Sequence, residues 1–292
     1  MKNFMCFDIG GTSIKYGVLK ENGEIIEKDS CDTEAYNGGK SILSKIKNIV
    51  NKFIIKYSLS GICISTAGIV NSEEGSIIFA SKLIPEYTGM KLKLELEKEF
   101  NLRVEVENDV NCAGLAEAYN GVAKGFNSVF SLTIGTGIGG SIIIDNKLYT
   151  GNSFSAAEIG YMNINGNDFQ DVASTRSLVE KVNNIKNTKE NKLNGKDIFR
   201  LVKNNDKDCI KAVDDLLENL SIGISNIALI LNPEIIVIGG GIASQDQYLY
   251  PILVKKIERK LIPYVFKNTK VAFAKNQNDA GIIGALSNFL SK

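Results

Sequence analysis

Three glycine-rich turns stand out in this 292-residue chain. Asp8-Ile-Gly-Gly-Thr12 follows an apolar run, Gly135-x-Gly137-x-x-Gly140 lies near the middle, and Gly239-Gly-Gly241 follows a second apolar run. Such turns expose backbone N–H groups that can converge on an anion. An Asp and a Thr beside the turn also suit a hydrated Mg²⁺ and a phosphate oxygen. Each turn alone has an ordinary explanation, because glycine and aspartate are common turn residues.

The central turn matches the glycine pattern of dinucleotide-binding proteins, but its context does not. That pattern must open a helix, whose N-terminus holds the pyrophosphate. Here the segment 141–146 reads Ser-Ile-Ile-Ile-Asp-Asn, which favours a strand and then a turn. The pattern therefore predicts a glycine hairpin, and at this point a phosphate loop and a purely structural hairpin both stay open.

One carboxylate is a candidate for chemistry. The chain contains no histidine, so catalysis must use carboxylates, lysines or hydroxyls. Asn108 and Asp109 end a predicted strand and precede a predicted helix. The ordinary interpretation is helix capping, for which Asn and Asp are preferred. A second role is compatible with it, because α/β proteins gather ligands at the carboxyl ends of strands.

The elements that must position these residues follow an alternating pattern typical of α/β proteins. Strands are predicted at 4–19 (two, around Gly10-Gly11), 24–30, 61–66, 104–108, 129–135, 141–151, 234–240 and 271–274. Helices are predicted at 40–57, 90–100, 110–120, 174–186, 208–231, 247–260 and 278–290. The segments FDIGGTSIKYGVL and LTIGTGIGGSIII resemble each other as strand–turn–strand units. We therefore predict two similar lobes with a ligand cleft between them.

Composition excludes several classes of function. The chain is 44% hydrophobic with a net charge of +1 and no block of like charge, so we expect no nucleic-acid partner and no membrane association. The N-terminus is quickly polar, which argues against a signal peptide and predicts a cytoplasmic protein. Five widely spaced cysteines predict reduced, mostly buried thiols.

In this order, DIGGT (8–12), the hairpin at 133–140 and IGGG (238–241) resemble the phosphate-1, phosphate-2 and adenosine motifs of the actin/hexokinase/Hsp70 superfamily. More narrowly, the chain resembles the ROK family of sugar kinases and sugar-sensing repressors, through STAGIV (65–70), ENDVN (107–111), AAEIGY (156–161) and NDAGIIGAL (278–286). The resemblance implies an α/β, two-lobed ribonuclease-H-like/actin-like ATPase fold with a central interdomain cleft. It implies a small N-terminal lobe from 1–112 plus 277–292, a large lobe from 113–276, and a homodimer.

The resemblance also implies an ATP- and Mg²⁺-dependent sugar kinase. Asp109 would be the general base that takes the proton from a sugar hydroxyl, expected to be O6, as it attacks the γ-phosphoryl group. The implied sugar-binding residues are Gly68, Asn108, Asp109, Glu158, Tyr161 and Gln170. The implied nucleotide-binding residues are Asp8 (which would also reach Mg²⁺ through water), Gly10, Gly11, Thr12, Lys15, Thr133, Gly135, Thr136, Gly137, Gly240 and Gly241.

The sequence departs from the family at its zinc motif. Most members carry a histidine where this chain has Tyr161, followed by a cysteine-rich segment that is absent here. We therefore expect no structural zinc. The last sugar-contacting glutamate of the family falls near Gln170 or Asp171. Members without histidine and zinc resemble β-glucoside kinases or N-acetylmannosamine kinases, so both substrates and plain glucose stay open.

Two other classes of function compete with the kinase. A sugar-responsive repressor would need a DNA-binding segment before the first motif, and only seven residues precede Asp8, with no basic surplus. A catalytically weak sugar-binding or regulatory ROK protein is the stronger alternative, because a fold does not fix a function.

Overall fold

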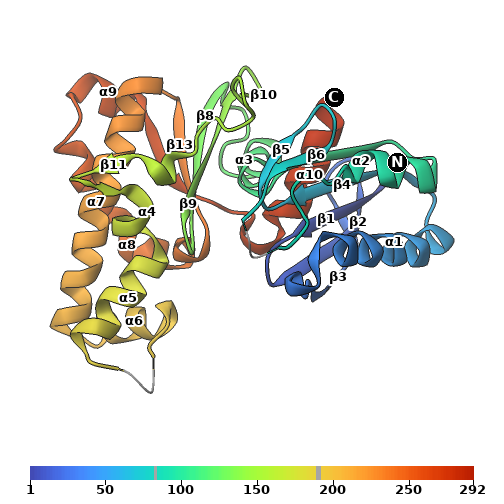
Figure 1. The fold of residues 1–292 in the computed structure, drawn as a ribbon. Helices are drawn as coiled ribbons and strands as arrows, with labels where there is room; N and C mark the ends of the chain where they lie inside the picture. Colours follow the sequence, from blue (N-terminus) through green and yellow to red (C-terminus); the bar gives the residue numbers. More distant parts are fainter. Residues whose placement is uncertain (82–83, 189–191) are drawn as a thin grey trace. The chain divides into compact units, whose positions relative to one another are not determined.

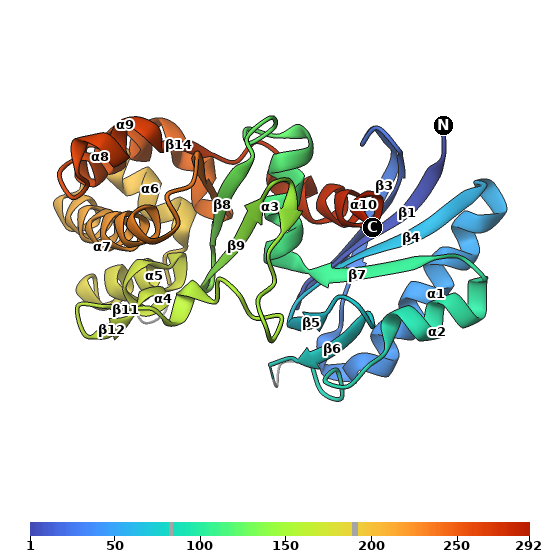
Figure 2. The same ribbon diagram turned by 90° about the horizontal axis from the view of Figure 1, so that it is seen from above.

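The computed structural model describes residues 1–81, 84–188 and 192–292, and they form two compact units (Figures 1 and 2). The first unit comprises Met1–Lys124, Lys147–Ala156 and Asn278–Lys292, and the second comprises Gly125–Asn146 and Ala157–Gln277. Helix α3 (Asp109–Asn120) packs along α10 (Ala280–Ser291) and so belongs to the first unit. The division predicted between residues 112 and 113 stays a prediction.

The first unit is built on a mixed sheet with the strand order β3-β2-β1-β4-β7. Its strands are β1 (Asn3–Ile9), β2 (Ser13–Lys20), β3 (Ile25–Asp32), β4 (Leu59–Thr66) and β7 (Val104–Asn108), with a separate hairpin of β5 (Ile69–Asn71) and β6 (Ser76–Phe79). Its other elements are η1 (Ala35–Asn37), α1 (Gly38–Lys56), α2 (Leu92–Phe100), α3, the short β10 (Lys147–Leu148) and α10.

Strand β1 is buried on both faces, which explains its unbroken apolar run. Met5 and Phe7 pack into one core with residues of α1 and α2, whereas Phe4 and Cys6 pack into another with residues of α3 and α10. This is the period-2 alternation of a strand between two layers of helices. Because Asp8 follows Cys6 at the same period, its side chain belongs to the α3/α10 face.

The second unit repeats the plan with a sheet in which β9, β8, β13 and β14 are neighbours in that order. Its elements are β8 (Ser128–Ile134), β9 (Ile138–Ile144), η2 (Ile159–Tyr161), β11 (Asn163–Ile164), β12 (Asn167–Asp168), α4 (Phe169–Ala173), α5 (Thr175–Ile185), α6 (Gly195–Lys203), α7 (Lys207–Leu231), β13 (Ile235–Gly239), η3 (Gly241–Gln245), α8 (Asp246–Glu258), α9 (Pro263–Asn268) and β14 (Lys270–Phe273). The short η4 (Gln277–Asp279) begins at the last residue of this unit and ends in the first unit. Helices α4 to α9 gather on one side of this sheet (Figures 1 and 2).

Helix α7 forms the centre of the second core. Its apolar stripe packs against the face of the sheet that carries Phe130 and Leu132, together with residues of α4, α5, α6 and α8. The helix begins at an Asp206 cap, which accepts a hydrogen bond from Cys209 N, and ends at Asn232 in the left-handed region. The helix predicted at 208–231 is therefore confirmed, and its apolar face forms the centre of the core.

The α/β class and the two strand–turn–strand units are confirmed. The predicted Asp145-Asn146 turn is also confirmed, since both residues have positive φ, which a tight hairpin turn requires. The strand predicted at 141–151 was wrong in its bounds, because β9 starts at Ile138 and stops at Ile144. Within the described ranges, no helix combines the length and apolar character needed to cross a bilayer.

Candidate functional site

The candidate acid site lies at one edge of the first sheet. Strands β1, β4 and β7 run parallel, with Ile9 beside Thr66 and Thr66 beside Asn108. The carboxyl ends of these strands therefore meet at that edge, where α/β proteins gather ligands. Asp8 and Asp109, a hundred residues apart in sequence, are brought close enough for the charge of Asp8 to affect the pKa of Asp109.

Asn108 caps helix α3, as the ordinary interpretation predicted, and it does more. Its Oδ1 accepts hydrogen bonds from Val110 N (2.9 Å) and Asn111 N (3.1 Å). Its Nδ2 donates to Gly68 O (2.9 Å) and to Asp109 Oδ1 (3.0 Å). An amide side chain offers two donor hydrogens and two acceptor lone pairs. All four are in use, so Asn108 ties Gly68, the start of α3 and the candidate base into one rigid group.

Asp109 is half-buried at the first position of α3, and its two oxygens differ. Oδ1 accepts from Val110 N (3.0 Å) and from Asn108 Nδ2. Among the described residues, both of these bonds fall on Oδ1, so Oδ2 is the oxygen that we assign to a ligand. Burial, followed by the negative charge of Asp8, raises the pKa of Asp109 to about 6, against the lowering effect of those hydrogen bonds. A carboxylate with a pKa near the working pH suits general-base catalysis.

Asp8 is held on three sides. Ser65 Oγ donates to its Oδ1 at 2.9 Å, and Lys15 Nζ lies 3.7 Å from its Oδ2. Gly281 of α10 lies so close that a Cβ there would be 2.4 Å from Oδ1. Burial raises the pKa of Asp8, and Lys15 and Ser65 oppose that rise. This single oriented carboxylate fits Mg²⁺, which is usually held by one or two carboxylates with water and phosphate as its other ligands.

The first glycine turn closes tightly between β1 and β2. Gly10 N donates to Ser13 O (3.0 Å), and Thr33 Oγ1 donates to Gly10 O (2.6 Å). A Cβ at Gly11 would meet nothing within 4 Å, so Gly11 and the exposed Thr12 face open space. Lys15, two residues after the turn, also donates to Asn278 O at 3.3 Å. The N–H of Gly10 is therefore occupied, and Gly11 and Thr12 are the positions open to an anion.

In the second unit, helix α5 holds the hairpin turn between β8 and β9. Thr175 N donates to Gly135 O (3.0 Å), and Arg176 Nε donates to Thr136 O (3.2 Å). Gly135 N is turned inward to Gly137 O (3.0 Å). Thr133, two residues before the turn, pairs with Gly139 of β9 and Gly239 of β13. The turn carbonyls are thus bound by protein, whereas the exposed Thr136 is accessible to a ligand.

The third glycine turn packs against the end of β8. Gly240 has φ +86°, and a Cβ there would lie 2.3 Å from Ile134 O. Only glycine fits this position without displacing the hairpin. A Cβ at Gly241, by contrast, would meet nothing within 4 Å. Gly240 therefore fixes the two turns against each other, and Gly241 faces an open space.

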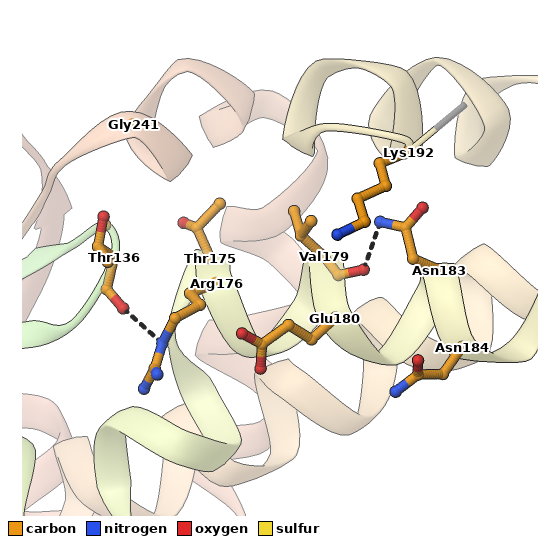
Figure 3. Close-up of a pocket in the computed structure, with 10 residues that line it drawn as sticks. Thr136, Thr175, Arg176, Val179, Glu180, Asn183, Asn184, Lys192 and Gly241 are labelled. Carbon is orange, nitrogen blue, oxygen red and sulfur yellow. Dashed lines mark hydrogen bonds between the residues drawn. The ribbon is translucent and has the colours of Figure 1, made fainter. Parts of the chain in front are cut away.

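That open space is a cavity of about 630 Å³ within the second unit (Figure 3). Its lining residues come from the hairpin turn, from one face of α5 and from the third turn; they are Gly135, Thr136, Thr175, Arg176, Val179, Glu180, Asn183, Asn184, Lys192 and Gly241. A second cavity of about 400 Å³ shares Thr175 and Gly241 with it and continues toward α6 and η3. Two of the predicted glycine turns thus border one continuous region of concave surface.

The residues predicted on the sugar side of the second unit lie on a loop and on α4. Glu158 precedes η2 and is exposed, and Tyr161 ends η2 with 67% of its surface exposed. Gln170 Oε1 lies between two glycines, 2.8 Å from a Cβ at Gly137 and 3.1 Å from one at Gly160.

Asp171, the alternative to Gln170, has a different environment. Its Oδ1 accepts from Arg176 Nη2 at 2.7 Å, and its side chain is 56% exposed. Gln170 therefore adjoins the loop that carries Glu158 and Tyr161, and Asp171 is engaged by α5.

Several residues of this site could not be recognised in the sequence. Ser65 and Gly281 hold Asp8, but nothing local in the sequence connects β1 with β4 or with α10. Arg176 and Glu180 were also missed, although α5 does carry a usable pattern. Helix α5 carries two pairs of residues spaced four apart, Thr175 with Val179 and Arg176 with Glu180. Residues at this spacing lie on the same face of a helix.

Comparisons with known proteins identify the family of this chain. The model of the ROK family matches residues 4–292, so this chain belongs to the ROK family. An uncharacterized protein of Clostridium perfringens is 48% identical over 98% of this chain and 97% of its own length. The β-glucoside kinase of Listeria innocua is 30% identical over 98% of this chain and 97% of its own length.

Solved structures confirm the actin-like fold of the family. A ROK family protein of Streptococcus pneumoniae in complex with sucrose has a TM-score of 0.88 and 27% identity, covering 99% of this chain and 98% of that one. A ROK family glucokinase of Streptomyces griseus, in complex with glucose and AMPPNP, has a TM-score of 0.83 and 26% identity, covering 97% of this chain and 98% of that one.

Proposed function

We propose that this protein is an ATP- and Mg²⁺-dependent sugar kinase that transfers the γ-phosphoryl group to O6 of a hexose, a β-glucoside or an N-acetylhexosamine. The observation that carries the proposal is Asp109, whose Oδ1 is fixed by two donors and whose pKa is raised to about 6. Phosphoryl transfer needs mainly positioning and charge stabilisation, with a carboxylate to orient the nucleophile. Named relatives of this chain are kinases of β-glucosides and of glucose, which supports the class of substrate.

In the proposed reaction, Asp109 Oδ2 accepts the proton of the sugar hydroxyl. The hydroxyl oxygen forms a bond to the γ-phosphorus as the bond from that phosphorus to the β,γ-bridging oxygen breaks. The products are the sugar phosphate, ADP and a proton, which first resides on Asp109. Asn108 holds the Asp109 carboxylate in place through one hydrogen bond. Asn108 is itself held by its three other hydrogen bonds. Its predicted contact with a sugar hydroxyl would require it to share or exchange one of these bonds.

The nucleotide is proposed to bind in the cavity beside α5, with its phosphates at the glycine turn. Thr136 and Gly241 offer backbone at one end of the cavity. Glu180 lies five residues after Thr175, which is about 7.5 Å along the helix. Glu180 also lines this cavity (Figure 3), and we propose that its carboxylate accepts hydrogen bonds from ribose hydroxyls. The structure of the AMPPNP complex of the related glucokinase supports a nucleotide ligand for this fold.

Asp8 is the residue proposed to hold Mg²⁺ through water, assisted by the phosphates. When bound, the ion would neutralise charge that develops on the phosphoryl oxygens. Ser65 and Gly281 fix the direction of the Asp8 carboxylate, and Lys15 supplies a positive charge beside it. Gly11 and Thr12 would donate N–H groups to phosphate oxygens.

The sugar is proposed to contact Gly68, Glu158, Tyr161 and Gln170. Gln170 is preferred to Asp171 because Asp171 is already paired with Arg176. A homodimer is proposed from family membership alone. The alternative, a catalytically weak sugar-binding or regulatory protein, has the same fold and would bind sugar without turnover.

A panel of sugars with Mg·ATP tests the proposal. We expect ADP release that depends on a hexose, a β-glucoside or an N-acetylhexosamine, and phosphorus NMR of the product should show a phosphate ester at C6. Sugar binding by calorimetry without ADP release would favour the regulatory alternative. No response to any sugar in either assay would overturn the proposal.

A further inference from the structure

The β5–β6 hairpin is a rigid element that directly follows Gly68. Val70 and Ile77 are buried in the core of the first unit. Ile77 N donates to Met90 O (2.9 Å), and Gly89 N donates to Ile77 O (2.7 Å). Lys292 Nζ binds Ser72 O at 2.7 Å, which ties the turn of the hairpin to the C-terminal residue. The hairpin is therefore held at both its strands and its turn.

The end of β6 touches the proposed sugar-binding loop. Ile69 pairs with Phe79 across the hairpin. Gly68 has φ +104°, and a Cβ there would lie 2.6 Å from Phe79 O. Gly68 O in turn accepts from Asn108 Nδ2, which also holds Asp109. A continuous series of contacts therefore runs from Asp109 through Asn108 and Gly68 to the backbone of Phe79.

The end of strand β6 exposes two apolar side chains, although the residue before them is buried. Phe79 is 60% exposed and Ile78 is 44% exposed, although Ile77 is buried. Ligand sites combine apolar and aromatic side chains with a few polar groups, and here Ile78 and Phe79 lie beside the polar site of Asn108 and Asp109. An aromatic ring offers a flat, rigid surface for stacking, which suits the apolar face of another ring.

We propose that Phe79, flanked by Ile78, is the platform for a ring attached at the anomeric carbon of the sugar, so that the preferred substrates are β-glucosides with a ring aglycone. This inference rests on the proposed kinase function. The proposed function puts the reacting hydroxyl at Asp109. Because the backbone of Phe79 is at the other end of the contact series, we assign the far end of the sugar and its substituent to that side. The open surface of Phe79 suits a substituent that extends out of the site rather than a small enclosed group.

The test compares kcat/KM for glucose, methyl β-glucoside, phenyl β-glucoside and N-acetylglucosamine in the wild type, Phe79→Ala and Phe79→Tyr. We expect the wild type to prefer the phenyl to the methyl glucoside. Phe79→Ala should lose about tenfold for the phenyl glucoside through KM, with glucose changed less than about twofold. Phe79→Tyr should retain the preference because the ring is kept. Ile55→Ala, which removes an exposed apolar side chain on α1, is the matched control and should change nothing.

Three results would overturn the inference while leaving the kinase intact. They are phosphorylation of glucose without the glycosides, an equal loss for all sugars in Phe79→Ala, and a loss confined to N-acetylglucosamine. Ile78→Ala provides a second variant, expected to show a smaller loss for the phenyl glucoside alone. Absence of any sugar-dependent ADP release in the wild type is a different result, because it removes the kinase proposal itself.

Discussion

The acid site of the first unit and the glycine-lined cavity of the second are built on opposite principles. At the acid site, polar atoms are tied to one another, with Asn108 making four hydrogen bonds and one oxygen of Asp109 assigned to a ligand. In the cavity, the N-terminal residues of α5 donate hydrogen bonds to the carbonyls of the hairpin turn. Gly135 and Gly241 face empty space. The first arrangement fixes a reacting atom, whereas the second leaves room for a large ligand. Substitutions should therefore affect turnover in the first region and ligand affinity in the second.

The largest effect is expected for Asp109→Asn. An amide cannot take the proton from the sugar hydroxyl, so kcat should fall by about 10²- to 10⁴-fold. Sugar and nucleotide affinity, measured by calorimetry, should change little because the side chain keeps its size. Asp215→Asn, which neutralises an exposed carboxylate paired with Lys181, is the matched control. Unchanged turnover in Asp109→Asn would show that the base is another residue.

Gly240→Ala and Gly241→Ala should separate the support of the cavity from its interior. A Cβ at position 240 would collide with Ile134 O, so this variant should lose roughly 1–3 kcal/mol of unfolding free energy. A Cβ at position 241 meets only open space, so stability should be kept while KM for ATP rises roughly tenfold. Thermal unfolding with and without AMPPNP, beside steady-state kinetics, measures both. Equal effects of the two variants would contradict this division.

The sequence could predict those parts of the site that depend on local chemistry. The N-cap role of Asn108 follows from its position between a strand and a helix, and the Asp145-Asn146 turn follows from residue type. It could not predict that Gly281 lies against Asp8, because that contact depends on how α10 packs on the sheet. Nor did it find the β5–β6 hairpin, whose short strands carry too few residues for a period to be counted.

The choice between Gln170 and Asp171 shows the same limit. Neighbouring residues on a helix point in different directions, and only the position of Arg176 decides which of them is engaged. Gln170→Ala should raise KM for the sugar by about three- to tenfold, the effect of losing one hydrogen bond. Asp171→Ala should leave KM for the sugar nearly unchanged. The reverse order in a kinetic comparison would place the sugar against Asp171.

The smallest effect concerns the pH dependence of kcat/KM, and it links the two acids of the first unit. Because the pKa of Asp109 is raised to about 6, the base is protonated and inactive below that pH, so the rate should fall as pH drops through 6. The charge of Asp8 contributes to the raised pKa of Asp109. Asp8→Asn should therefore shift the acidic side of the pH–rate profile to lower pH, in addition to any change in the maximal rate.

The raised pKa of Asp109 also affects stability, because the folded state binds more protons than the unfolded state between about pH 4 and 6. The carboxyl therefore favours folding below this window, and that contribution is lost as pH rises through 6. Asp109→Asn should then raise the melting temperature relative to the wild type at pH 8, and the difference should shrink toward pH 4. A pH profile unaffected by Asp8→Asn would mean that burial alone sets the pKa of the base and that the two carboxylates act independently.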